Sequence, residues 1–531
     1  MDISYLGHAG FQIDHAGHTL VLDPWLSREG AFLRSWFQYP ENHLLADRVA
    51  SLDPARSAIY VSHAHPDHFD RSFLGRIDRA TPLVTGRYVR RHLARELRAM
   101  GFTEVHELNT GESLELRGFR LTLYVNESYS NEDSGILVEA GGCRFLDLND
   151  CRAHDAIDLD ALRPVDLFTV QFSGASWFPC VYDYEPDRRA ELTARKNEQK
   201  FRNVQALIER LAPKLFVPSA GPGCFLDAEL FRHNFGAPSA FPEFREFRPW
   251  VEATGVPSPE LAPGDHIRLR AGEMPRVEAS GPRPPASEAD RRAYLRGYAE
   301  RFAGESALPE TDRDAFPLFR AALEAKIAAL RQPLVTRHRI GVRVTGRPGL
   351  PDGCLLVNLQ RRCLEDVEEL PAAGTYSFRY ENRVLDHFFR CGAPWEELML
   401  SLRFQVSREP DVFDTRISDF MRLEAQDLRH YPRRARSGRV CIEHEGVRYE
   451  VDRYCPHQGG DLSRALIVDG ALICPRHGWA FDLSRGGRSE ESLTTIHAVR
   501  LADADSPGDP APALDPDREA ASLPCPRRRA G

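Results

Sequence analysis

The 531-residue sequence predicts an α+β protein of several domains: an αββα sandwich, a small α+β module and a C-terminal all-β domain. Three observations support this prediction. The length allows roughly three or four domains. Short alternating runs at the N-terminal end indicate strands. A Pro- and Ser-rich break, "EASGPRPPASEADRR", precedes a second set of helical and strand-like patterns.

The sandwich is predicted over residues 1–250. Alternating runs such as "DISYLG", "HTLVLDP" and "SAIYVSH" read as strands separated by Gly and Asp turns. Apolar residues at helical spacing between 201 and 211 predict a helix that ends before Pro213, and the strand "KLFVPSAGPG" follows. Strands, a helix and further strands indicate two sheets inside and helices outside.

Three further segments complete the predicted organisation. Residues 290–430 combine helical and strand-like runs in a module without a chemical motif, and residues 437–501 carry strand-like runs such as "GALICPRH". Residues 502–531 are rich in Pro, Ala and Asp, so we expect a disordered tail.

Composition excludes several classes of function. The net charge of −9 gives no broad basic surface for nucleic acid. No apolar run reaches the roughly 20 residues of a membrane span. The first residues lack a signal-peptide pattern, so we expect a cytoplasmic protein with neither nucleic acid nor membrane as a partner. The 11 cysteines then suggest reduced thiols and metal ligands.

The stretch "YCPHQGGDLSRALIVDGALICPRHGW" offers two Cys/His pairs. These are Cys455, His457, Cys474 and His477. A structural zinc site could use the same four residues. Gly459 and Gly460 after the first pair and Pro475 within the second instead resemble the Rieske iron–sulfur domain. The resemblance implies a [2Fe–2S] cluster in which each loop gives one Cys and one His, with Trp479 packed beside it.

A second metal motif, "IYVSHAHPDHFD", follows a predicted strand. Its candidate ligands, which are also the candidate catalytic residues, are His63, His65, Asp67 and His68. Alternate residues project the same way, so His63 and His65 can bind one ion while Asp67 and His68 turn toward a second. The pattern resembles the metallo-β-lactamase superfamily. That resemblance implies that Asp150 bridges the metals and that Asp23 orients a ligand.

The remaining candidates around this site are less specific. His8 in "YLGHAGF" is as easily a structural histidine as a residue that faces the site. Acidic and phenolic residues stand where relatives place further histidines: Glu127, Tyr129, Asp133, Asp227 and Glu229. Each could equally lie in a solvated loop. Carboxylates in place of imidazoles favour iron or manganese over zinc. Trp177 and Phe178 are candidate walls of a substrate pocket, although core packing is the commoner role.

The two motifs together resemble the CMP-N-acetylneuraminate hydroxylases, which join a metallo-β-lactamase fold to a Rieske domain. Segments such as "GHTLVLDPWLS", "FSGASWFP" and "WEELMLSLRFQVSREPDVF" carry the likeness. It implies a monooxygenase with mono- or dinuclear iron in the N-terminal site, dioxygen, a small anionic substrate, and electrons from a ferredoxin or a b-type cytochrome with its reductase. Two departures stand out: the Rieske domain comes last, and Tyr129 replaces a family histidine.

Several alternatives stay open on sequence alone. Oxygenation could occur at carbon or at nitrogen, and the chain could form a homo-oligomer. A metal-dependent hydrolase with a redox-regulatory Rieske domain would use the same motifs without consuming electrons. An electron-transfer protein on a degenerate scaffold is the non-catalytic alternative.

Overall fold

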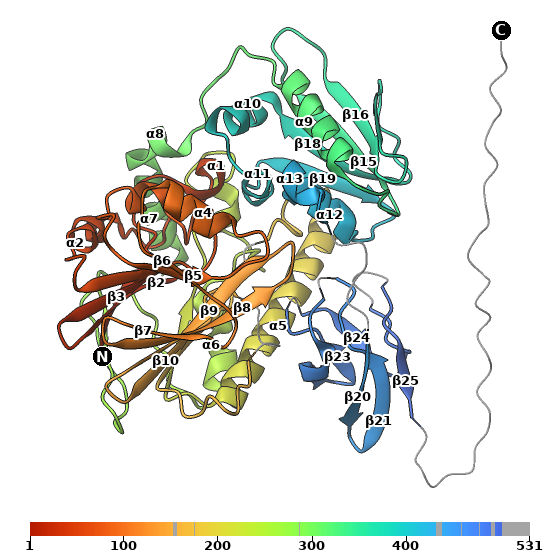
Figure 1. Cartoon of the computed structure of the whole chain (residues 1–531). Coiled ribbons are helices and arrows are strands. Elements are labelled where there is room, and N and C mark those ends of the chain that lie inside the picture. Colours follow the sequence, from red (N-terminus) through yellow and green to blue (C-terminus); the bar gives the residue numbers. More distant parts are fainter. Residues whose placement is uncertain are drawn as a thin grey trace, which may run out of the picture.

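The computed structural model describes residues 1–151, 157–174, 176–285, 287–431, 438–457, 459–476, 478–489 and 494–501 (Figure 1). His477, residue 437 and the predicted tail at 502–531 lie outside these described residues. The α+β multidomain class is confirmed. Among the described residues, no helix has both the length and the apolar content needed to cross a membrane.

Two sheets form the N-terminal sandwich. The first has the order β14-β13-β1-β2-β3-β4-β5-β6 and the second β12-β11-β10-β9-β8-β7. The strands of the first are β1 (Asp2–Gly7), β2 (Gly10–His15), β3 (His18–Leu22), β4 (Ser57–Tyr60), β5 (Leu83–Gly86), β6 (Val105–Leu108), β13 (His266–Arg268) and β14 (Arg276–Glu278). Those of the second are β7 (Ser113–Leu116), β8 (Phe119–Glu127), β9 (Glu132–Ala140), β10 (Cys143–Asp147), β11 (Leu167–Gln171) and β12 (Leu215–Ser219).

Helices cover both outer faces of this sandwich. They are α2 (Ala46–Ala50), α3 (Arg71–Leu74), α4 (His92–Ala99), α5 (Pro186–Leu211) and α6 (Phe244–Glu252), while α1 (Ala31–Arg34) packs toward the middle module. Phe11 of the first sheet meets Phe145 of the second between the sheets, while Phe201 of α5 packs on Phe247 of α6 outside. The helix predicted to end before Pro213 is α5, and its buried residues recur along one face as the spacing predicted.

The parallel strands place the candidate ligands at one edge. β3, β4, β5 and β6 are parallel neighbours, and so are β10, β11 and β12. Asp23 follows β3, His63 follows β4 and Asp150 follows β10. The carboxyl ends of parallel strands meet at the same edge of a sheet, which is where open α/β sheets place their sites.

The sandwich extends past residue 250, where the sequence placed its end. β13 pairs with β1, and β14 pairs with β13. Beyond the Pro-rich break, α7 (Glu288–Arg301) and α8 (Ala303–Ser306) follow. Tyr298 of α7 and Phe302, the residue after this helix, pack on Phe37 of the sandwich. This contact buries one face of α7. We therefore propose that residues up to about 307 belong with the sandwich.

The middle module is a five-stranded sheet covered by helices. Its order is β17-β16-β15-β18-β19. The strands are β15 (Arg339–Thr345), β16 (Gly353–Asn358), β17 (Cys363–Asp366), β18 (Thr375–Glu381) and β19 (Phe404–Glu409). The helices are α9 (Phe316–Ala329), α10 (Asn382–Cys391), α11 (Trp395–Leu400), α12 (Thr415–Arg422) and α13 (Ala425–Leu428).

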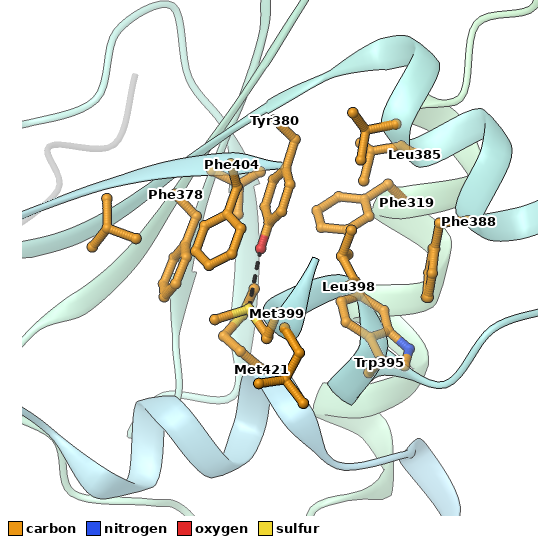
Figure 2. Packing of buried hydrophobic residues seen from close by; sticks show 14 of the residues in the cluster. Phe319, Phe378, Tyr380, Leu385, Phe388, Trp395, Leu398, Met399, Phe404 and Met421 are labelled. Atoms are coloured by element: carbon orange, nitrogen blue, oxygen red, sulfur yellow. Dashed lines mark hydrogen bonds between the residues drawn. The ribbon is translucent and has the colours of Figure 1, made fainter. Parts of the chain in front are cut away.

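One hydrophobic core joins the module to the sandwich. Within the module, Phe319, Tyr380 and Trp395 pack together, and the Tyr380 hydroxyl donates a hydrogen bond to Met399 Sδ at 3.5 Å (Figure 2). The same cluster of buried residues continues into Trp36 of the sandwich, whose Nε1 donates to the Leu400 carbonyl at 2.9 Å. The module is thereby held against the edge that carries the candidate ligands.

A C-terminal pair of three-stranded sheets forms the predicted all-β domain. The strands are β20 (Arg439–His444), β21 (Val447–Asp452) and β25 (Ala498–Arg500), then β22 (Leu466–Val468), β23 (Ala471–Ile473) and β24 (Ala480–Asp482). The domain lies against α5, where Arg202 pairs with Asp469. A Cβ at Gly478 would lie 2.6 Å from Asn203 Nδ2, so a larger residue would separate the two surfaces.

A buried arginine satisfies the polar groups between module and sandwich. Arg403 donates from Nε to the Leu33 carbonyl at 3.2 Å and to Ser35 Oγ at 3.0 Å. Its Nη1 lies 3.3 Å from Asp227 Oδ2, and the Arg403 side chain is 1% exposed. Leu33 has a φ of 55°, a left-handed conformation that non-glycine residues adopt at a cost.

Replacing Arg403 with methionine should lower the free energy of unfolding by about 3–5 kcal/mol, because Asp227 would stay buried without its cation. Urea unfolding followed by circular dichroism measures this change. The Arg343→Met variant is the matched control, since that side chain is 38% exposed and 3.8 Å from Asp352. It should shift stability by less than about 0.5 kcal/mol. An Arg403→Met midpoint equal to that of the wild type would contradict the account.

The same interface predicts a pH dependence through His387 on α10. Burial, reinforced by Arg34, Arg390 and Arg403, lowers the pKa of His387 from 6.5 to about 4. Between these values the unfolded chain binds a proton that the folded protein does not, so this residue reduces stability as the pH falls from 6.5 to 4. Unfolding midpoints across this range should fall less steeply in His387→Gln. Identical slopes in both proteins would refute the prediction.

Candidate metal centres

The loop after β4 brings most of its predicted ligands into the interior. His63 is 2% exposed, Asp67 4% and His68 0%. Two groups of ligand atoms, each within 4.8 Å of one another, form here: His8 with Asp67 and His68, and His63 with His68 and Asp150. His68 belongs to both groups, and because one imidazole nitrogen binds one ion, the two groups are alternative ligand sets for the ion that His68 would hold.

Unsatisfied polar atoms in this site fit a bound cation. Asp67 Oδ1, His68 Nε2 and Asp150 Oδ1 are buried and make no hydrogen bond to any of the described residues, and His68 Nε2 lies 3.4 Å from Asp150 Oδ1. Buried polar atoms are almost always paired, and leaving one unpaired costs about 1–3 kcal/mol. A metal ion held by His68 would satisfy its Nε2 together with a carboxylate oxygen of Asp67 or of Asp150, since both atom types are ordinary metal ligands.

A buried carboxylate fixes the orientation of His68. Asp23 Oδ2 lies 2.7 Å from His68 Nδ1, and Ser62 donates to the same carboxylate from its backbone N–H at 2.8 Å and its hydroxyl at 2.6 Å. With Nδ1 engaged, Nε2 of His68 is the nitrogen left for a metal. This arrangement matches the orienting role that the family resemblance implies for Asp23.

The charges of the site are strongly coupled. Burial alone would lower the pKa of His68, but Asp150, Asp23 and Asp67 outweigh it and raise that pKa well above its ordinary value. Burial likewise opposes ionisation of Asp67, yet His68 and His8 keep the pKa of that carboxyl low. The carboxylates favour positive charge at this position, and a metal ion would supply it.

His65 differs from the other residues of its motif. It lies outside both groups, and its Nδ1 is 2.8 Å from His63 Nε2. Its Nε2 is 3.5 Å from Glu396 Oε1, a carboxylate on α11 of the middle module. Glu396 lies in the segment "WEELMLSLRFQVSREPDVF", and sequence reasoning missed it because nothing in that segment marks a residue of a metal site. A role for His65 as a ligand stays a prediction.

The downstream candidates divide clearly. Asp133 is 5% exposed, and its Oδ1 lies 3.3 Å from His63 Nδ1, so it borders the site. Tyr129 donates to the Asp427 carbonyl at 2.6 Å instead. Asp227 and Glu229 pair with arginines of the module, Arg403 and Arg383 respectively. The Glu127 side chain lies outside what the structure describes.

The two aromatic residues proposed as pocket walls pack elsewhere. Trp177 and Phe178 are half-buried against the core that the sandwich shares with the module. The ring of Phe178 lies edge-on to Tyr182 at 5.2 Å between centroids. Packing therefore accounts for both side chains, and their role in a pocket stays a prediction.

Two loops of the C-terminal domain have matching geometry. Cys455 and Cys474 are 0% and 1% exposed. In each loop a glycine four residues on, Gly459 or Gly478, has a φ near 70° and donates its N–H to the cysteine carbonyl at 2.9 Å. A Cβ at Gly460 would lie only 3.0 Å from Cys474 Sγ. Because glycine has no side chain, this position leaves space beside the thiol. The paired loops fit a cluster held between them.

The first histidine of this site makes ring contacts. His457 stacks on Trp479 with centroids 4.2 Å apart and an interplanar angle of 5°, as expected for a tryptophan packed beside the cluster. Phe413 of the middle module meets His457 edge-on at 5.6 Å. His477, the fourth predicted ligand, lies outside the described residues.

Two family models match the chain. A β-lactamase superfamily domain matches residues 2–219, and a Rieske [2Fe-2S] domain matches residues 424–497. A Mycolicibacterium smegmatis protein whose name includes "Rieske 2Fe-2S iron-sulfur protein" is 27% identical over 520 residues, which cover 92% of this chain and 97% of that protein. A Mycobacterium tuberculosis protein with a similar name is 26% identical over the same length.

Other similar proteins match over shorter regions. The cytidine monophosphate-N-acetylneuraminic acid hydroxylase of Mus musculus is 25% identical over 42% of this chain and 39% of its own length. A metal-dependent hydrolase of Azorhizobium caulinodans is 26% identical over 27% of this chain and 59% of its own length. The solved structure of CmlA, a diiron β-hydroxylase from Streptomyces venezuelae, has 19% identity, covers 50% of this chain and 54% of that one, and has a TM-score of 0.37. This degree of structural likeness says nothing about chemistry.

Because His68 belongs to both groups, His68→Ala should lose nearly all metal beyond the iron matched by acid-labile sulfide. His8→Ala should lose no more than half, since only one group contains His8. Elemental analysis of purified protein measures both. His92→Ala, whose ring pairs with Asp427 at 2.9 Å, is the control and should retain all of the metal. Full retention by His68→Ala would mean that the metal lies elsewhere.

The motifs, the sheets and the family models agree on both ends of the chain. A Rieske cluster transfers single electrons, so the C-terminal site is suited to redox work. The protein joins an N-terminal domain of the β-lactamase superfamily to a C-terminal Rieske [2Fe-2S] domain.

Proposed function

We propose that this protein is a Rieske-linked monooxygenase, which uses dioxygen and external electrons to oxygenate a small anionic substrate. The observation that carries the proposal is the presence of two different metal sites on one chain. A hydrolase of the β-lactamase superfamily needs only a metal-bound water and no electrons. A one-electron carrier on the same polypeptide therefore favours a reaction that consumes electrons.

The donor set of the N-terminal site supports iron as its metal. Asp67 and Asp150 provide hard oxygen ligands beside the imidazoles of His8, His63 and His68. Sites of mixed histidine and carboxylate ligands accept iron, manganese and zinc, and the electron carrier on the same chain favours iron among them. When bound, iron supplies the one-electron chemistry that dioxygen reduction needs. We propose a mononuclear or a dinuclear iron site here.

Two lysines near this edge support a negatively charged substrate. Lys196 and Lys200 of α5 reach the segment after β11, where Lys196 Nζ donates to the Phe178 carbonyl at 3.0 Å and Lys200 Nζ donates to Gln171 Oε1 at 2.7 Å. The Gln171 N–H donates to the carbonyl of Asn149, the residue before Asp150. Two ammonium groups at this edge would attract an anion.

Similarity to a named hydroxylase supports the reaction type. The matched part is under half of the hydroxylase, so its substrate does not transfer to this chain. We propose oxygenation at carbon or nitrogen, with electrons from a ferredoxin or a b-type cytochrome and its reductase. We further propose that the protein is cytoplasmic and binds neither nucleic acid nor membrane. A homo-oligomer is compatible with this proposal.

The test follows dioxygen consumption with a ferredoxin, its reductase and a panel of small anions. His63→Ala should reduce consumption to the background set by reoxidation of the cluster alone, while the visible spectrum of the cluster stays unchanged. Cys474→Ala should abolish both the spectrum and the consumption, because it removes a proposed cluster ligand. Consumption at the wild-type rate by His63→Ala would refute the proposed oxygen site.

A metal-dependent hydrolase with a redox-regulatory Rieske domain is the second candidate. The likeness to a protein named as a metal-dependent hydrolase favours it. This candidate predicts turnover without dioxygen, and turnover that survives Cys474→Ala. The monooxygenase predicts neither result.

A further inference from the structure

The middle module reaches the N-terminal metal site through Glu396 on α11. Glu396 Oε1 lies 3.5 Å from His65 Nε2. Arg422, the last residue of α12, donates from Nε to the same carboxylate oxygen at 3.0 Å. Both carboxylate contacts are largely shielded from water, since the Arg422 side chain is 10% exposed and that of Glu396 19%. One end of α12 is thus fixed beside a residue of the metal loop.

The other end of α12 lies at the Rieske site. Asp414 caps the helix, and its side chain accepts hydrogen bonds from the N–H groups of Arg416 and Ile417. Phe413, the residue before this cap, lies edge-on to His457 at 5.6 Å and to Trp479 at 6.0 Å between ring centroids. Figure 1 shows α12 on the side of the module that faces the C-terminal sheets.

The helix between these two contacts is short. α12 contains 8 residues and therefore spans about 12 Å. It is also held firmly, because Ile417, Phe420 and Met421 are buried in the core that joins module and sandwich. A rigid, buried element consequently lies between a proposed cluster ligand and a carboxylate that contacts the metal loop.

We propose that electrons pass from the cluster to the metal site within one chain along α12. Phe413 lies at the cluster end of this connection, and Glu396 on α11 lies at the metal end. This inference rests on the proposed function. In each transfer the reduced cluster loses one electron and the metal of the N-terminal site gains it, and the external donor then reduces the cluster again. Phe413 and Glu396 are positioning residues, because neither is among the proposed ligands.

The test measures how quickly dioxygen reoxidises the cluster. Full-length protein is reduced without air, freed of reductant and mixed with air-saturated buffer, while the visible absorbance of the cluster is followed. His63→Ala, which lacks one ligand of the proposed oxygen site, gives the background rate. Phe413→Leu should slow reoxidation about tenfold toward that background, equal to about 1.4 kcal/mol of barrier. Phe413→Tyr keeps the ring and should restore the rate.

Matched controls separate transfer from folding. Phe389 is also half-buried in the module but contacts Phe319 and Phe388, so Phe389→Leu should reoxidise at the wild-type rate. Acid-labile sulfide, metal content and the electron paramagnetic resonance spectrum of the cluster should match the wild type in all Phe413 and Phe389 variants. If Phe413→Leu assembles poorly, Glu396→Ala at the far end of α12 should show the same slow reoxidation with an intact cluster.

The outcomes distinguish the two levels of the proposal. A wild type faster than His63→Ala, together with Phe413→Leu and Glu396→Ala at the wild-type rate, would overturn the role of α12 and leave the proposed function standing. A wild type no faster than His63→Ala would overturn both.

Transfer within one chain has its own test. Co-expressed His63→Ala and Cys474→Ala chains each lack one end of the connection, so their mixture should reoxidise at the His63→Ala rate. A return to the wild-type rate would show transfer between chains and overturn the inference.

Discussion

The buried carboxylate of Asp23 holds the N-terminal site in place. Asp23 follows β3 directly. Its carboxylate accepts two hydrogen bonds from Ser62, which lies after β4, and faces Nδ1 of His68. Two neighbouring parallel strands and the metal loop are thereby joined by one side chain that is 0% exposed. The position of His68 follows from this contact, and both groups of candidate ligands depend on His68.

The other parts of the protein are arranged around this edge. The module shares a core with the sandwich and is further tied by Arg403, so α11 is held where Glu396 meets His65. The Rieske domain contacts α5 and the start of α12. The module and α5 contact both the Rieske domain and the sandwich. The Rieske domain, although last in the chain, is therefore linked to the metal site near residue 63.

Features of short range were predictable from the sequence. The strands around the metal loop, α5 and the two Cys/His loops follow from local periodicity and spacing, and the fold class is confirmed. Asp23 and Asp150 came from a family resemblance, and the structure brings both to the site. The pairing of β13 with β1 could not be predicted, because it joins residues more than 260 positions apart. Glu396 could not be found for the same reason, since its place in the site depends on the packing of α11.

The central claim is that the N-terminal site holds iron that works with the Rieske cluster. The most direct measurement is the content of iron, zinc and acid-labile sulfide per chain in protein purified without air, for the wild type and His63→Ala. The account predicts iron in excess of the sulfide-matched amount in the wild type, and a clear fall in that excess in the variant, because one of the two ligand groups contains His63. Zinc in the N-terminal site, with iron only in the cluster, would contradict the claim and favour a hydrolase.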